Sequence, residues 1–293
     1  MIGYTFIKLL PILLLTVGGY LLSRIYKLNL DTLVKIITDF LMPMLIFYSL
    51  YSSDLEGNLV LNLAGATTLI VVLLTGSAYV YARMARIDAR TFMPAVIFMN
   101  SGFLGIPLMK LWGGFPAMNL IVIYDQIQTI YIFTLGILII TGGLSTKSLS
   151  AVVRSPILWA VFGGFFFRFL NIPLPEPLLT TMDFGGNAAP PLAAVALGIS
   201  LHETRFHIDK HVIAGLLLRF GGGLLFGFLA SELFGLTGLS RTVVIVASSL
   251  PSAVFTSVLP LRSGVRSDFA GTMVVLSTIL AVLTIPLTFY LTV

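Results

Sequence analysis

One carboxylate lies deep inside an apolar part of the sequence, close to residues that could share its chemistry. Asp125 comes eight residues into the apolar run 117–140, roughly 12 Å along a helix that rises 1.5 Å per residue. Gln128 follows three residues later and would share its helix face. Together with Asn100 and Ser101, these side chains could coordinate Na⁺, or Asp125 could carry a proton. The alternative is a structural acid that hydroxyl groups or a helix N-terminus satisfy.

The composition places these residues in a membrane. Of the 293 residues, 57% are hydrophobic and 10% are charged, whereas soluble domains carry about 25% charge; the mean hydropathy is +1.03. The net charge of +5 is spread between apolar runs and not gathered in one patch, which argues against a nucleic-acid partner. We therefore predict an all-α membrane protein with ten transmembrane helices in a lipid bilayer. The apolar runs are 2–22, 30–50, 59–82, 92–111, 117–140, 156–170, 178–201, 212–233, 242–261 and 269–293.

The basic residues of the loops predict an orientation. Eleven of them fall in alternate loops, beginning with Arg24 and Lys27, whereas the opposite loops hold only Lys110, Arg168 and Arg241. Basic loops face the cytoplasm, so both termini should lie outside. We expect a multi-pass protein of the cytoplasmic membrane of a bacterium whose first run is retained and not cleaved as a signal peptide. The absence of cysteine excludes disulfides and thiolate metal sites, and no cofactor is expected.

The stretch 100–107 interrupts the fourth apolar run. Pro107 removes a backbone donor, and Gly105 loosens the same turn. Interrupted backbone at membrane depth is tolerated only where it is buried in protein or lines a cavity, because lipid cannot form hydrogen bonds. We therefore expect the binding site here.

The ninth run contains a matching interruption. Ser249, or Ser248, precedes Pro251 as an N-cap residue precedes a proline of the first helical turn. Two half-helices would then begin near the middle of the membrane, and their N-termini would favour a small organic anion. The candidate substrate-binding residues are Asn100, Ser101, Gly105, Pro107, Gln128, Ser249, Pro251 and Ser252, and the candidate ion-coupling residues are Asp125, Asn100 and Gln128.

The spacing of the prolines predicts an inverted repeat. Pro43 and Pro107 interrupt the second and fourth runs 64 residues apart, and Pro191 and Pro251 interrupt the seventh and ninth runs 60 residues apart. Five runs in each half would make the second half enter the membrane from the opposite side. Chance placement of prolines is the alternative. The predicted repeats are 1–145 and 146–293.

Two motifs resemble the auxin efflux carrier family. Residues 100–108 read NSGFLGIPL, similar to the fourth helix of that family, and residues 190–201 read PPLAAVALGISL, similar to its seventh helix. The length is like that of short bacterial members, which include permeases labelled for malonate or malate. The resemblance implies the fold of bile acid/sodium symporters, in which helices 1, 2, 6 and 7 form a scaffold. Helices 3 to 5 and 8 to 10 form a transport domain, and the broken helices 4 and 9 cross.

The same resemblance implies secondary transport by elevator-type alternating access, often in a homodimer joined through the scaffold, here through helices 2 and 7. In the plant carriers a glutamine of the fifth helix and an asparagine ahead of the break help to hold the substrate carboxylate, and Gln128 and Asn100 match them. We expect a carrier for a small organic anion, with H⁺ or Na⁺ coupling through Asp125. The alternatives are a cation/proton exchanger or a sodium-coupled organic anion symporter of the same fold, or a channel built from the same broken helices.

Two further groups of charges need an explanation. Arg219 lies within the eighth run, where it could attract anions, pair with a carboxylate or extend its head group to the inner surface. Asp31, Lys35 and Asp39 recur at helical spacing and should pair with one another at the start of the second run.

The sequence carries no complete catalytic motif. Tyr124-Asp125 is similar to the first aspartate motif of intramembrane aspartyl proteases, but Asp183 lacks the Gly-x-Gly that should precede the second aspartate. HExxH, Gly-x-Ser-x-Gly and P-loop patterns are missing as well. We therefore expect that the protein is not an enzyme.

Overall fold

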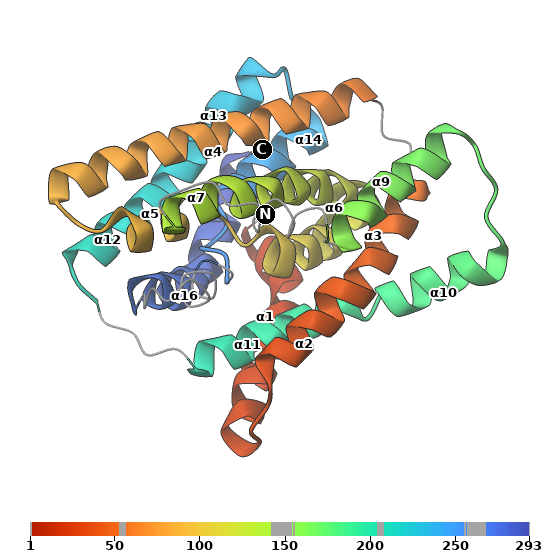
Figure 1. The fold of residues 1–293 in the computed structure, drawn as a ribbon, viewed down its shortest axis with the longest axis horizontal. Coiled ribbons are helices and arrows are strands. Elements are labelled where there is room, and N and C mark those ends of the chain that lie inside the picture. Colours follow the sequence, from red (N-terminus) through yellow and green to blue (C-terminus); the bar gives the residue numbers. More distant parts are fainter. Residues whose placement is uncertain are drawn as a thin grey trace.

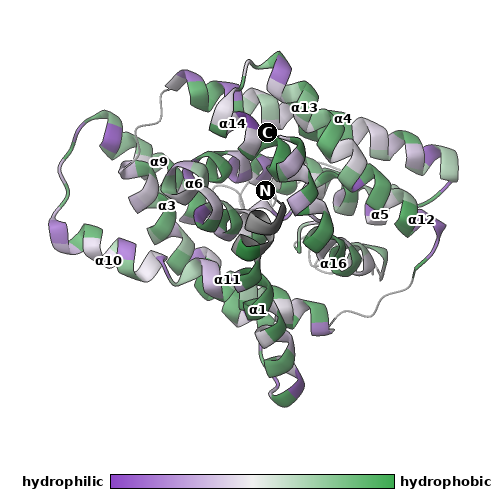
Figure 2. Cartoon of the chain, turned by 180° about the vertical axis from the view of Figure 1, so that it is seen from behind, coloured by the Kyte–Doolittle hydropathy of each residue, from purple (hydrophilic) through white to green (hydrophobic). Residues whose placement is uncertain are grey.

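In the computed structural model, the described residues are 2–52, 57–141, 154, 156–203, 208–254, 256 and 268–292. Among them the regular secondary structure is helical, apart from one isolated β-bridge. Figure 2 shows hydrophobic residues along most of the helices, with hydrophilic residues gathered near helix ends and connections. The prediction of an all-helical membrane protein is confirmed, whereas the count of ten spans stays a prediction.

Six helical segments of the described chain are long and apolar enough to cross a membrane. They are Leu30–Tyr51, Gly57–Ala85, Ser101–Ile140, Glu176–His202, Lys210–Leu233 and Phe269–Leu291. Three shorter apolar helices accompany them, at Leu10–Ile25, Pro156–Phe169 and Gly238–Ser248.

The first part of the chain forms three long rods. The second rod changes to π-helical turns ahead of Pro43, which then occupies the first turn of the next helix, where its missing N–H costs least. Asn29 caps the start of this rod by accepting a hydrogen bond from Thr32 N at 2.9 Å. The elements are α1 (Ile2–Ile25), α2 (Leu30–Ile36), the π-helix η1 (Ile37–Leu41), α3 (Met42–Tyr51) and α4 (Gly57–Ala85).

The next stretch contains the first interruption. Asp88 caps its first helix, and the helical path is lost after nine residues and resumes at Ser101. A sharp kink follows at Gly114, whose φ of 67° is strained for any side chain. The kink separates the fourth apolar run from the fifth. The elements are α5 (Ala89–Ile97), η2 (Ser101–Gly105), α6 (Ile106–Tyr131), η3 (Ile132–Gly136) and α7 (Ile137–Thr141).

The second part of the described chain repeats the alternation of long and interrupted helices. Its elements are α9 (Pro156–Phe169), α10 (Glu176–Gly186), α11 (Ala189–Glu203), α12 (Lys210–Leu217), η4 (Leu218–Gly222), α13 (Gly223–Leu233), α14 (Gly238–Ser248) and α16 (Asp268–Leu291).

We divide the helices into two groups by their packing, although α1 of the first group also packs on α6 and α16 of the second. In the first group α1 packs on α11, and α3 packs on α9 and α10. In the second group α4 packs on α5, α6 and α13, and α14 packs on α6 and α13. Figure 1 shows α4, α13 and α14 along one side of the molecule and α1, α2 and α11 along the other. A Cβ on Gly198 would lie only 1.9 Å from Thr16 O, so this glycine permits the close crossing of α1 and α11.

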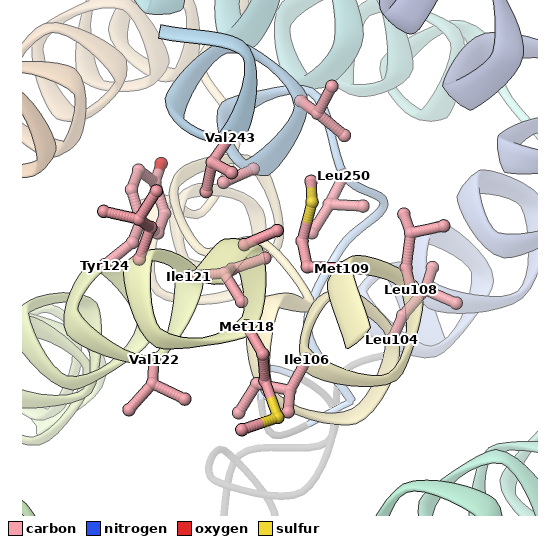
Figure 3. Close-up of a cluster of buried hydrophobic side chains, with 14 of the residues drawn as sticks. Leu104, Ile106, Leu108, Met109, Met118, Ile121, Val122, Tyr124, Val243 and Leu250 are labelled. Atoms are coloured by element: carbon pink, nitrogen blue, oxygen red, sulfur yellow. The ribbon is translucent and has the colours of Figure 1, made fainter. Parts of the chain in front are cut away.

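The two halves of α6 and the end of α14 share an apolar core. Figure 3 shows Met109, Ile121 and Leu250 gathered between these elements. A Cβ on Gly105 would lie 2.5 Å from Ile121 Cδ1 and 2.8 Å from Leu250 Cδ1, so the glycine lets the helix that follows the first interruption pack against both. This core holds the two interrupted segments together.

Candidate functional site

The two interruptions pair with each other in the middle of the second group. Met99 lies opposite Ser252 in an antiparallel β-bridge. Backbone groups that would be unpaired in two broken helices are therefore satisfied across the crossing. The flanking hydrogen bonds run from Asn100 N to Pro251 O at 2.8 Å and from Ala253 N to Phe98 O at 3.0 Å.

The outer edge of Met99 is covered by one side chain. In such an antiparallel pair the N–H and C=O of Met99 point away from the partner segment. Gln128 Oε1 accepts from Met99 N at 3.0 Å, and Gln128 Nε2 donates to Met99 O at 2.7 Å. Nε2 also donates to Ser101 Oγ at 2.8 Å. The side-chain amide of Gln128 therefore forms the two hydrogen bonds that a neighbouring strand would form with Met99. Both N–H donors of its Nε2 are used, one by Met99 O and one by Ser101 Oγ.

On the other side of the crossing, Ser277 accepts the hydrogen bond of the Ser252 backbone N–H. Ser252 N donates to Ser277 Oγ at 3.0 Å, while Ser252 Oγ donates to Ala95 O at 2.7 Å. Gln128 follows Met99 by 29 residues and Ser277 follows Ser252 by 25, so each half of the chain supplies its own cap. Ser277 is not among the residues predicted from the sequence, although its spacing from the second interruption indicates this role.

Arg219 joins the ends of both interrupted helices. It is 0% exposed, and its Nη1 donates to Val96 O at 2.6 Å and Ile97 O at 3.0 Å at the end of α5. Its Nη2 donates to Ser248 O, the last residue of α14. Two negative helix ends therefore converge on one buried cation. Of the alternatives for Arg219, extension to the inner surface is wrong, because its described hydrogen bonds go to buried backbone carbonyl groups.

Asp125 lies against the opposite, positive end of the crossing, at the first turn of η2. Its Oδ1 accepts from Ser101 Oγ at 2.6 Å, and its Oδ2 accepts from Gln126 Nε2 at 3.2 Å. A Cβ on Gly102 would lie 3.2 Å from Asp125 Oδ1. The carboxylate therefore rests on the backbone where the second half-helix begins, a position that favours negative charge.

A cavity of about 370 Å³ opens beside this carboxylate. Its inner end is formed by the first interruption and by Asp125 and Gln128, and its outer end by α2, η1 and the start of α9. The cavity therefore lies on the boundary between the two helix groups, within the size range of small-molecule sites. Its polar and charged lining residues are Asp31, Lys35, Thr38, Asp39, Asn100, Asp125, Gln128, Thr129 and Arg154.

Asn100 offers the cavity an unused donor. Its side chain is 2% exposed, and its Nδ2 has no hydrogen-bond partner in the described part of the chain. A buried amide without a partner costs about 1–3 kcal/mol, and a bound acceptor would remove that cost. This is the feature of the cavity wall that most directly points to a ligand.

The opposite side of the same boundary is closed. Ser49 of α3 donates to Asn119 Oδ1 of α6, and Asn119 Nδ2 donates back to Ser49 O at 3.3 Å. Lys110 of α6 donates to Asn187 between α10 and α11. The exposed part of the cavity lining is the end with Asp31 and Lys35, whereas these contacts join the two groups outside the cavity lining.

Two local predictions about the interruptions are wrong. The first interruption lies at 98–100, ahead of Pro107, which sits in the first turn of α6 after the π-helical turns of η2. Ser248 ends α14 and Ser249 is its C-cap, with both hydroxyls donating to Ile245 O at 2.9 Å. These serines therefore close one helix and do not open the next. The start of a following half-helix falls outside the described residues.

The other predicted residues take different places around the crossing. Asn100, Asp125 and Gln128 line the cavity, and Ser101 joins Asp125 to Gln128. Direct substrate contact by Gly105, Pro107, Ser249, Pro251 and Ser252 stays a prediction, since none of them is among the cavity residues. Of the predicted charged stripe, Lys35 pairs with Asp31 at 2.6 Å, while Asp39 accepts from Thr38 at 2.9 Å. Among the described residues, no three acidic or histidine side chains form a metal-binding group.

The helical membrane architecture and a cavity at crossed interruptions define a multi-pass membrane protein of the transporter class. The chain matches the membrane transport protein family over residues 4–145 and 140–289, and it belongs to that family. The family inferred from the NSGFLGIPL motif is thereby confirmed.

Two relatives support this assignment. The chain is 31% identical over 291 residues to an uncharacterized transporter of Methanothermobacter thermautotrophicus, covering 95% of each chain. It is 34% identical over 96 residues to an uncharacterized transporter of Methanocaldococcus jannaschii, covering 32% of this chain and 31% of that one.

Proposed function

We propose that the protein is a secondary transporter that moves a small organic anion, a carboxylate, through the cavity beside the first interruption. The observation that carries the proposal is the buried, unpartnered Nδ2 of Asn100 in the cavity wall. A carboxylate oxygen is a suitable acceptor for this amide, and the adjacent start of η2 favours negative charge. Arg219 does not compete for the substrate, because its described contacts are backbone carbonyls.

Transport would proceed by elevator-type movement of the second helix group, which comprises α4 to α7, α12 to α14 and α16, against the first group as scaffold. The cavity and the sealing contact between Ser49 and Asn119 lie on opposite sides of the boundary between these groups. Sliding along that boundary would close one side and open the other. By the distribution of basic loops, the open side faces the cytoplasm and both termini lie outside.

The test is flux into proteoliposomes. Purified protein is reconstituted and offered a panel of radiolabelled mono- and dicarboxylates under imposed pH, Na⁺ or voltage gradients. A carrier gives saturable uptake that is accelerated by unlabelled substrate on the other side, whereas a channel does not show this acceleration. No carboxylate flux under any gradient would refute the proposal.

A cation/proton exchanger of the same architecture is the second candidate. The observation that favours it is the carboxylate of Asp125 in the cavity wall, which no cationic side chain of the described chain neutralises by direct contact. An exchanger would move protons against Na⁺ with no organic solute present. A pH-sensitive dye inside the same vesicles separates the two candidates.

The proposed transporter is a homodimer in which the second and seventh apolar runs form the interface. Both runs carry large apolar side chains on the surface, with Phe40 58% and Phe184 84% exposed. Light scattering of the purified protein after subtraction of the detergent mass would give the oligomeric state. A monomer would remove the dimer from the proposal and leave the transport mechanism in place.

A further inference from the structure

The site at the start of η2 is already occupied by a negative group of the protein itself. Asp125 accepts from Ser101 Oγ at 2.6 Å and lies against Gly102, where an added Cβ would be 3.2 Å from the carboxylate. A carboxylate substrate would be attracted to this same turn by the same helix end. Two carboxylates held side by side repel each other unless one of them is protonated.

We propose that the first turn of η2 holds one negative group at a time, so that a monocarboxylate binds only when Asp125 carries a proton. This inference rests on the proposed function and names its coupling ion. The proton comes from water in the cavity and adds to the Asp125 carboxylate, which becomes a neutral acid. The substrate carboxylate then takes the negative position and accepts from Asn100 Nδ2. Release of the substrate returns the proton to solution, and Asp125 resumes its contacts.

The second half of the chain supplies no further coupling group at the equivalent positions. Since Met99 pairs with Ser252, Ser101 corresponds to Val254, two residues later in each case. Since Gln128 and Ser277 are matching caps, Asp125 corresponds to Val274, three residues earlier in each case. Val254 and Val274 are buried and pack together with Leu197. The crossing is thus polar on the side of Ser101 and Asp125 and apolar on the side of Val254 and Val274. Because only the polar side has a carboxylate, one proton would accompany each substrate.

The other charged groups at the cavity do not substitute for Asp125. Lys35 is paired with Asp31 at 2.6 Å near the cavity mouth. Asp39 accepts from Thr38 there. The described hydrogen bonds of Asp125 include no cation, and Arg154 is the remaining cation of the described cavity lining. A monocarboxylate that binds beside a protonated Asp125 needs no further positive partner. A pH dependence could also come from other titratable and charged groups that lie around Asp125 and its cavity. They are Tyr124, Asp31, Lys35, Asp39, Arg154 and, at the ends of the interrupted helices, Arg219.

The test measures binding and proton uptake together. Acetate, propionate, lactate and benzoate are titrated calorimetrically into the purified full-length protein, at several pH values and in buffers of different ionisation enthalpy. The affinity of the wild type for a bound probe should rise about tenfold for each unit by which pH falls, until Asp125 is protonated. One proton should be taken up per bound carboxylate, and replacing Na⁺ by choline should change nothing.

Asp125→Asn is the decisive variant, because an amide keeps the shape and removes the charge. It should bind the same probe with a pH-independent affinity, as tightly as the wild type at the lowest pH, and take up no proton. Glu232→Gln, which changes an exposed carboxylate outside the cavity, should retain the uptake of one proton. If Asp125→Asn does not fold, the number of protons that the wild type takes up per bound carboxylate tests the inference by itself.

Several results would overturn the inference. They are pH-independent binding by the wild type, a requirement for Na⁺, loss of binding in a folded Asp125→Asn protein, and failure of all four probes to bind either protein. A protein that transports a carboxylate in vesicles but takes up no proton on binding it refutes this inference alone. Absence of any carboxylate flux refutes the proposed function itself.

Discussion

The side-chain amide of Gln128 satisfies both backbone polar groups of Met99, at 3.0 Å and 2.7 Å. Met99 O also accepts from Ser101 N at 2.9 Å, whereas the amide of Gln128 is the partner of Met99 N among the described residues. The amide is therefore part of the support of the crossing, whatever it also does for a substrate.

Gln128→Leu should destabilise the protein by about 2 kcal/mol, because it leaves the buried N–H of Met99 unpaired and removes one of the two hydrogen bonds to Met99 O. This corresponds to a fall of about 4–8 °C in the apparent Tm, measured in detergent by the loss of the monodisperse fraction. Thr134→Val is the control, since the Thr134 hydroxyl donates only to Ile130 O of its own helix. An unchanged Tm for Gln128→Leu would show that the amide does not support the crossing.

Arg219→Met should be the most destabilising substitution in the second helix group. It removes charge-assisted hydrogen bonds to Val96 O, Ile97 O and Ser248 O, each worth about 1.5–3 kcal/mol. We expect little folded protein by size-exclusion chromatography. Arg219→Lys keeps the charge but cannot reach both helix ends, so it should be intermediate. Arg241→Met, which loses an exposed contact with Glu232, should leave the yield of folded protein near that of the wild type.

The sequence predicted that the fourth and ninth runs are interrupted, because Pro107 and Pro251 cannot continue a regular helix. It did not predict where. Pro107 fits the first turn of α6, and the chain leaves the helical path seven to nine residues earlier, at 98–100. The reason is tertiary, since the extended residues are stabilised by partners 29 and about 150 residues away in the chain.

The roles of three side chains were not predicted, for similar reasons. Serine ahead of proline is typical of a helix start, yet Ser248 and Ser249 donate back to Ile245 O and end α14, because a serine hydroxyl can also bond to a carbonyl of the preceding turn and compete with the helix. The role of Arg219 depends on carbonyls 122 and 123 residues earlier, and no local pattern reports such a contact. Asp125 and Asn100 could be selected from the sequence because polar groups inside apolar runs are costly without a purpose.

Asn100→Ala should lower carboxylate flux at least tenfold, equivalent to about 1.4 kcal/mol of lost interaction, with little change in Tm. The reason is that the Asn100 Nδ2 has no partner within the described protein, so only a ligand loses a contact. Initial uptake in proteoliposomes and thermal stability are measured on the same preparation. A large fall in stability would instead assign Asn100 to the support of the interruption.

Gly221 and Gly223, two glycines of the run 221–223, should change the thermal stability in opposite directions when each is replaced by alanine. A Cβ on Gly223 would lie 2.1 Å from Ser248 O, so Gly223→Ala must push η4 and α13 away from the end of α14 and should cost several degrees of Tm. Nothing lies within 4 Å of a Cβ on Gly221. Gly221→Ala should therefore be neutral or more stable by about 0.4–1 kcal/mol. Equal effects of the two substitutions would contradict the close approach at Gly223.

A disulfide between α3 and α6 should hold the closed side of the boundary shut. The chain has no cysteine, so Ser49→Cys with Asn119→Cys can be oxidised without side reactions. Because the two side chains contact each other across the two helix groups, the bond would prevent their sliding, and flux should stop on oxidation and return on reduction. The control is either single variant, Ser49→Cys or Asn119→Cys, which meets the same oxidant but cannot form the bond within one chain. The oxidised control should keep its flux, whereas full flux through the oxidised Ser49–Asn119 pair would exclude relative movement of the two groups as the transport step.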